Sequence, residues 1–125
     1  MVKSIIYTVV AILLCLGVFF GAQYYIHNQF TKFNEALDTL YDKIENKEAN
    51  REDAYAVKKM WADKKSRLHI FIPHNDISYI DYWLSEACAF IYTGEYDLAL
   101  ANVEVLLEIT SNLPDAYSVK LENVF

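Results

Sequence analysis

An uninterrupted apolar segment near the start of the chain limits the possible folds more than any other feature. The segment Ile5–Ile26 reads IIYTVVAILLCLGVFFGAQYYI, and no Lys, Arg, Asp or Glu occurs from Ser4 to Gln29. A helix that crosses the hydrocarbon core of a bilayer needs about 20 mostly apolar residues. The segment is long enough, and it therefore predicts a membrane-spanning helix.

A cleaved leader is the main alternative for this segment. The core of a signal peptide is shorter, about 7 to 15 residues, and ends at an A-x-A-like cleavage site. Here Phe20 stands two positions before Ala22, and a bacterial lipoprotein signal would need a small residue where Leu14 precedes Cys15. We therefore expect residues 1–26 to form an uncleaved signal anchor, so that the protein crosses the membrane once.

Two glycines and three lysines bear on how this anchor is used. Gly17 and Gly21 form a GxxxG pattern, which lets two helix backbones approach closely in lipid, although glycine is frequent in membrane helices in general. A contact with a second membrane helix is one hypothesis for them.

Lys3 precedes the segment, while Lys32 and Lys43 follow it. These charges leave open which side of the membrane holds the rest of the chain.

Residues 27–125 carry a repeated helical pattern. Apolar residues recur at steps of three and four, which is the spacing of one helix face. We expect an all-α domain in which the first helix continues the membrane span, followed by two antiparallel hairpins (27–72 and 75–113) and a short last helix (114–125). The predicted buried stripes of the first and third helices are Phe30, Phe33, Leu37, Leu40 and Ile44, and Ile77, Ile80, Leu84, Ala87 and Ile91. Trp61, Trp83 and Ala99 are also predicted in the core.

The two hairpins repeat each other, because a shift of 47 positions (30 to 77) places the first stripe on the second. A repeated hairpin is typical of a short solenoid or of four-helix packing. The second hairpin resembles one tetratricopeptide repeat, with Glu86 in place of the motif's first Leu and a late Pro114. The matching positions are Trp83, Ala87, Phe90, Gly94, Tyr96, Ala99 and Leu100. Such repeats usually bind peptides. This resemblance implies only how the two helices pack, and it does not imply peptide binding.

A second likeness extends over the whole chain. Its features are the N-terminal span, Trp61, His74 followed by an acid and Ile77, the turn at 94–97 and the terminal Leu121-Glu122-Asn123. These features resemble an uncharacterised family of short, membrane-anchored helical proteins of Gram-positive bacteria, filed as a domain of unknown function. The resemblance implies a fold and an anchor, and it implies no activity.

The chemistry-bearing residues form no recognisable catalytic pattern. His69, His74 and Asp76 lie close in sequence but lack HExxH or paired-Cys spacing. We expect His74 and Asp76 to cap the next helix and to form the joint before it, and we expect no metal or other cofactor. No nucleophile elbow or phosphate-binding loop is present. Residues 75–125 hold one basic residue, Lys120, against nine acids, which argues against nucleic acid as a partner.

The stretch WADKKSRLHIFIPHND (61–76) is predicted to return to the membrane. A helix from Ile26 to about residue 47 rises about 30 Å, and a second helix of similar length would run back. Lys64, Lys65 and Arg67 would then meet lipid headgroups, with Phe71 at the interface. Alternatively, the cations favour the helix C-terminus and the apolar residues fill a joint.

The expected function is a non-enzymatic interaction module at the membrane surface. Its partners would be the lipid bilayer and either another membrane protein or a second copy of the chain. A self-associating structural protein, built on the GxxxG pattern, is the first alternative. A small membrane-bound enzyme is the second.

Overall fold

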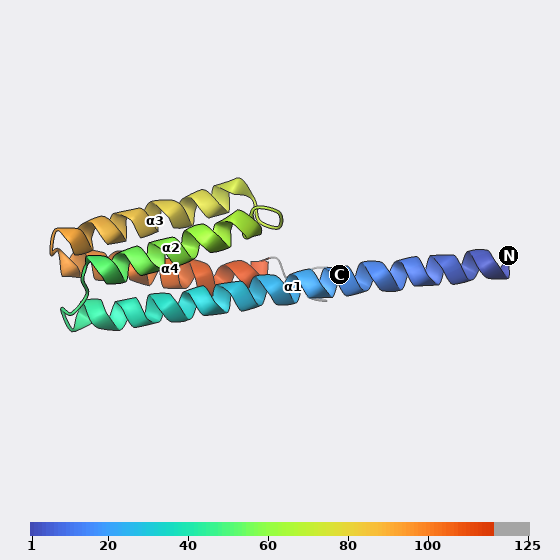
Figure 1. The fold of residues 1–125 in the computed structure, drawn as a ribbon, viewed down its shortest axis with the longest axis horizontal. Coiled ribbons are helices and arrows are strands. Elements are labelled where there is room, and N and C mark those ends of the chain that lie inside the picture. Colours follow the sequence, from blue (N-terminus) through green and yellow to red (C-terminus); the bar gives the residue numbers. More distant parts are fainter. Residues whose placement is uncertain (117–125) are drawn as a thin grey trace.

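The computed structural model describes residues 1–116, and within them all regular structure is helical. The four helices are α1 (Val2–Glu45), α2 (Arg51–Leu68), α3 (His74–Tyr92) and α4 (Tyr96–Ala116). Successive helices run in opposite directions, and α1 is much the longest (Figure 1). The all-α class that the sequence predicts is confirmed.

The first helix has two parts with different surroundings. Its N-terminal half projects from the bundle with none of α2, α3 or α4 beside it (Figure 1). Every side chain up to Gly21 is exposed, and the first buried one is Ile26. By length and composition α1 could cross a membrane, and its most apolar stretch contains no buried residue. A core helix of a soluble bundle would bury that surface, whereas here no other described helix covers it.

The other half of α1 contributes one wall of the core. The predicted stripes of α1 and α3 are all buried, as are Trp61 and Ala99. The ring of Trp61 lies 6.4 Å from that of Phe30 and 5.1 Å from that of Phe33. Trp83 differs from the expectation, because it is only partly buried and packs against the edge of the core.

The bundle is closed by a contact between its first and last helices. α4 packs along both α1 and α3, and α2 also packs on both of them. Asn34 on α1 donates from its amide to Thr110 Oγ1 (2.8 Å) and to the carbonyl oxygen of Leu107 (3.3 Å) on α4. This is an up-down-up-down four-helix bundle. The four-helix packing is confirmed, whereas the tetratricopeptide-like arrangement is not, since an open stack of hairpins lacks the contact between α1 and α4.

Local signals explain most helix ends. Asn50 and Asp53 form a reciprocal capping box at the start of α2, as their spacing predicts. Asp53 also pairs with Lys43 at 2.8 Å, which ties the end of α1 to α2. Between α3 and α4, Gly94 has φ of 76°, a left-handed conformation that costs glycine little.

The start of α3 and the end of α4 differ from the sequence prediction. α3 begins at His74 after Pro73, and no side chain caps it. His74 and Asp76 therefore lie in the first turn of α3. The negative charge of Asp76 interacts favourably there with the positive end of the helix dipole. α4 runs through Pro114, which is buried, to Ala116. An interior proline often kinks or breaks a helix, but α4 continues through Pro114, so no new helix starts there. The rest of the predicted last helix lies outside the described residues.

Candidate functional site

The α2–α3 connection lies at the end of the bundle where α1 leaves it (Figure 1). The ring of Phe71 lies 6.0 Å from that of Tyr25, which is near the end of the apolar segment. Ile72 is buried, whereas Ile70 is 81% exposed and Phe71 is 39% exposed. Ile72 thus fills a joint between helices, and its two neighbours leave an apolar surface beside the end of the apolar segment.

The three basic residues before this connection have different surroundings. Lys65 forms an ion pair with Asp81 on α3 at 3.1 Å. The indole of Trp61 donates to the same carboxylate at 2.6 Å. Lys65 therefore fastens α2 to α3, and its charge is locally balanced. Asp81 is not among the residues expected from the sequence, although a buried tryptophan N–H usually needs an acceptor.

Lys64 and Arg67 lie instead on the side of α2 that meets α1. Lys64 donates from Nζ to Gln29 Oε1 at 2.8 Å. Burial lowers the pKa of Lys64, and the positive charges of Lys32 and Arg67 lower it further. Three cations from two helices thus converge on one surface close to the end of the apolar segment.

The histidines at the connection stack on each other without forming a metal site. The rings of His69 and His74 are 6.0 Å apart and nearly parallel. His74 Nε2 lies 3.3 Å from Ser78 Oγ. In residues 1–116 no group of three or more His, Cys, Asp or Glu side chains is arranged to hold a metal ion. These two histidines pack at the joint.

The outer side of α3 carries aromatic and acidic residues that sequence reasoning did not single out. Tyr79 and Tyr82 are 63% and 62% exposed. Tyr82 contacts the edge of Trp83, with ring centroids 5.5 Å apart. A hydrogen bond to the Glu86 carboxylate raises the pKa of Tyr82. These four residues, called the α3 outer face below, fall at positions 79, 82, 83 and 86, a helical spacing that could have revealed them as a second stripe.

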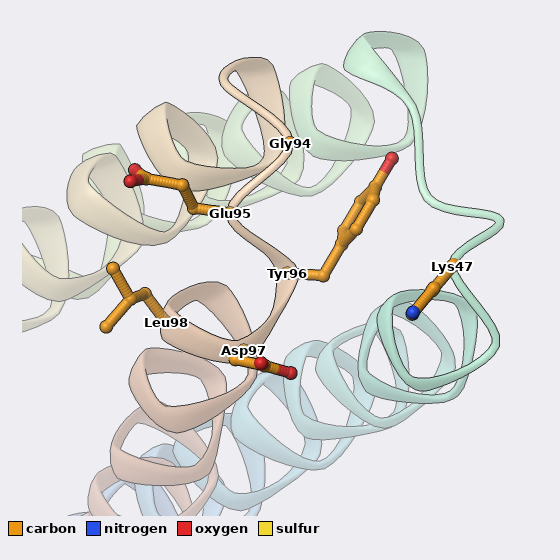
Figure 2. Close-up of a pocket in the computed structure, with 6 residues that line it drawn as sticks. All are labelled: Lys47, Gly94, Glu95, Tyr96, Asp97 and Leu98. Atoms are coloured by element: carbon orange, nitrogen blue, oxygen red, sulfur yellow. The ribbon is translucent and has the colours of Figure 1, made fainter.

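An open pocket of about 500 Å³ lies at the opposite end of the bundle and is lined by Lys47 and residues 94–98, whose side chains Figure 2 shows. The side chain of Tyr96 points across it towards the α1–α2 connection (Figure 2). Its hydroxyl donates to the carbonyl oxygen of Ala49 at 3.3 Å. Tyr96 thus joins the two loops, and this pocket is a gap beside a structural contact.

The glycines of the GxxxG pattern have no packing role within the bundle. A Cβ atom placed on Gly17 or on Gly21 would meet no other side chain or distant backbone atom within 4 Å. Both lie on the part of α1 that projects from the bundle. Because glycine has no side chain, the face of α1 that carries them is accessible to another helix.

A family described as a domain of unknown function (DUF4363) matches residues 20–124. The chain belongs to this family. The match covers the end of the apolar segment and all four helices as far as they form the bundle. It confirms the resemblance to an uncharacterised family, while the Gram-positive source stays an expectation. No curated protein and no solved structure matches the chain.

Proposed function

We propose that this member of the DUF4363 family is a non-enzymatic interaction module, anchored in the membrane by a single span, that binds a partner protein at the membrane surface. The apolar part of α1 is the anchor. The α3 outer face is the binding surface, and its exposed aromatic stripe is the observation that carries the proposal.

The stripe on α3 is separate from the residues that build the core. Ile77, Ile80 and Leu84 already supply the buried side of this helix. Tyr79 and Tyr82 are not needed for that purpose, since both are well exposed, whereas Trp83 packs partly against the edge of the core. Tyrosine and tryptophan are enriched in protein interfaces and in their energetically dominant centres. A group of aromatic residues on an exposed helix face is therefore better explained by protein binding than by a contribution to the stability of the fold.

The charge of the surrounding hairpin indicates the chemistry of the partner. Glu86 lies within the stripe, and the sequence from 75 onwards is strongly acidic. Complementary charge increases the rate of association and excludes unsuitable partners. The proposed partner is thus a basic segment of a protein in, or close to, the same membrane.

Site-specific photocrosslinking of the full chain in native membranes tests this proposal. A photoreactive amino acid at Tyr82 should give a defined adduct with one partner protein. The matched control is Tyr55 on α2, which is equally exposed at 63% and should not give that adduct. Adducts with lipid alone, or the same adducts from both positions, would argue against the α3 outer face as a binding surface.

Self-association is the second candidate, and the open glycine face favours it. Because no atom in the described chain fills the space at Gly17 and Gly21, a second α1 could pack there. The mass of the full chain in detergent, measured by light scattering, should then be that of a dimer. Gly17→Leu with Gly21→Leu should convert it to a monomer. A monomeric parent protein removes this candidate but leaves partner binding in place.

A further inference from the structure

A groove of about 430 Å³ lies on the surface that α1 and α2 share. It is open to solvent, and Gln29 of α1 stands on one side of it. Its remaining lining, all from α2, is Ala56, Lys59, Met60, Asp63, Lys64 and Arg67. Three cationic side chains against the single carboxylate of Asp63 leave the groove with a net charge of +2 (3 − 1).

The cations of the groove are not neutralised within the bundle. In residues 1–116 the lysine ion pairs are Lys43 with Asp53 and Lys65 with Asp81. Lys64 instead donates to the neutral amide oxygen of Gln29. Lys32 and Arg67 are near enough to disfavour its charged form. Like charges that converge with only the Asp63 carboxylate among them are costly, and an anionic ligand would relieve that cost.

The height of the groove above the bilayer indicates which anion is available. Gln29 follows Ile26 by three residues, which is about 4.5 Å along the helix. The headgroup layer of each leaflet is about 5 to 7 Å thick. If the hydrocarbon core ends near Ile26, the end of the groove that Gln29 lines therefore lies among the lipid phosphates. Arg67 is close to the C-terminus of α2. It lies at the same height as Gln29, because α2 runs back towards the apolar part of α1 (Figure 1).

We propose that this groove binds the phosphate-bearing headgroup of an anionic phospholipid in the leaflet where the span of α1 ends. The Arg67 guanidinium would donate two hydrogen bonds to phosphate oxygens, and the Lys64 ammonium would supply a point charge beside them. Gln29 holds the Lys64 side chain in place, while Asp63 weakens the attraction. The proposal rests on the membrane anchoring proposed above and is independent of the protein partner.

Lipid selectivity of the full chain tests the groove. The chain is reconstituted into phosphatidylcholine bilayers that contain spin-labelled phosphatidylglycerol or spin-labelled phosphatidylcholine, and the motionally restricted fraction of each is compared. The parent should prefer phosphatidylglycerol several-fold, with a factor of about five for each basic side chain in contact. Lys64→Gln with Arg67→Gln should bring the ratio close to one.

A charge-relocation variant separates the groove from diffuse attraction to an anionic surface. Lys64→Gln with Ser66→Lys keeps the net charge and moves the cation to another face of α2, at a height that differs by only about 3 Å. A fall in selectivity of about five-fold in this variant supports the groove, whereas unchanged selectivity overturns it. Asp63→Asn should increase the preference, because it removes the opposing carboxylate.

The remaining outcomes are equally decisive. A parent protein without preference for phosphatidylglycerol overturns the groove while leaving the anchor intact. Failure of the chain to insert into the bilayer overturns the anchor itself. Helical circular dichroism of each variant shows whether the bundle is folded, and Asp63→Asn, at an exposed position, supplies a gain of binding that misfolding cannot imitate.

Discussion

The indole Nε1–H of Trp61 donates a hydrogen bond of 2.6 Å to Asp81 Oδ1, which joins α2 to α3 across 20 positions of sequence. Lys65 pairs with the other oxygen of the same carboxylate at 3.1 Å. One acidic side chain therefore satisfies a donor from the core and a cation from the surface. It holds the two helices together next to the α2–α3 connection.

Removal of this carboxylate should destabilise the bundle. Asp81→Ala leaves the indole N–H of Trp61 without its acceptor, which costs about 1 to 3 kcal/mol. Asp81→Asn keeps an acceptor and should cost less. Urea unfolding of the full chain in detergent, followed by helical circular dichroism, measures both. Equal stability of parent and Asp81→Ala would mean that water replaces the carboxylate at no cost.

The two tryptophans should differ in their contribution to stability. Trp61 is 2% exposed and contacts Phe30 and Phe33. Trp61→Ala should therefore cost about 3 to 5 kcal/mol. Trp83→Ala removes a partly buried ring at the edge of the core and should cost less. The same unfolding experiment ranks them, and a reversed order would contradict the packing described above.

The bundle should fold without its anchor. All of the buried core lies at or after Ile26, and residues 27–125 form a chain long enough for a small hydrophobic core. That fragment should show helical circular dichroism and a cooperative thermal transition. A gradual, non-cooperative loss of signal would show that folding depends on lipid or on a partner.

The Asp53 carboxylate should make stability fall in acid. The hydrogen bond from Lys43 lowers the pKa of Asp53 in the folded protein, and the backbone N–H of Asn50 lowers it further, although burial opposes them. Because the folded pKa lies below the unfolded value of 3.8, this stabilisation is present above the unfolded pKa and is lost as pH falls through the folded pKa.

The matched variant for this prediction is Asp53→Asn, which cannot titrate. Urea unfolding between about pH 6 and pH 2.5 should show that the free energy of unfolding falls more steeply for the parent than for Asp53→Asn. The difference between the two proteins should shrink towards the acid end. Parallel pH profiles would show that Asp53 is not linked to folding.

The α2–α3 connection should lie at headgroup level. A fluorescent label on Phe71→Cys, in a Cys15→Ser background, should be quenched strongly by a quencher carried on lipid headgroups. The same label on Glu95→Cys, at the other end of the bundle, should not be quenched. Lys64→Glu with Arg67→Glu should reduce quenching at position 71, because each cation lost near an anionic surface costs about 1 kcal/mol. Lys65 stays unchanged, since its ion pair with Asp81 supports the fold.

Absence of quenching at position 71 in the parent would contradict this prediction. The connection would then be only an internal joint, with Phe71 packed on Tyr25. Quenching that is equal at positions 71 and 95 would indicate a bundle lying flat on the membrane. Neither result would affect the fold of the four helices.

The sequence by itself determined the features that depend on neighbours along the chain. The length of the apolar segment predicted the projecting part of α1, and steps of three and four identified the buried stripes. The spacing of Asn50 and Asp53 is that of the capping box seen at the start of α2, and the turn expected at 94–97 lies before α4. In each case the interacting groups lie within a few residues of each other, so that helix geometry alone brings them together.

Only the tertiary structure decided which helix faces meet. Periodicity shows that one side of a helix is buried but not what covers it, so the contact between α1 and α4 that closes the bundle could not be predicted. For the same reason Lys64 and Lys65, adjacent in sequence, have separate roles: consecutive residues point about 100° apart on a helix, one towards Gln29 and the other towards Asp81. Trp61 is buried in the core, whereas Trp83 is only partly buried at its edge, because Trp83 points about 100° away from the buried Leu84 that follows it on α3.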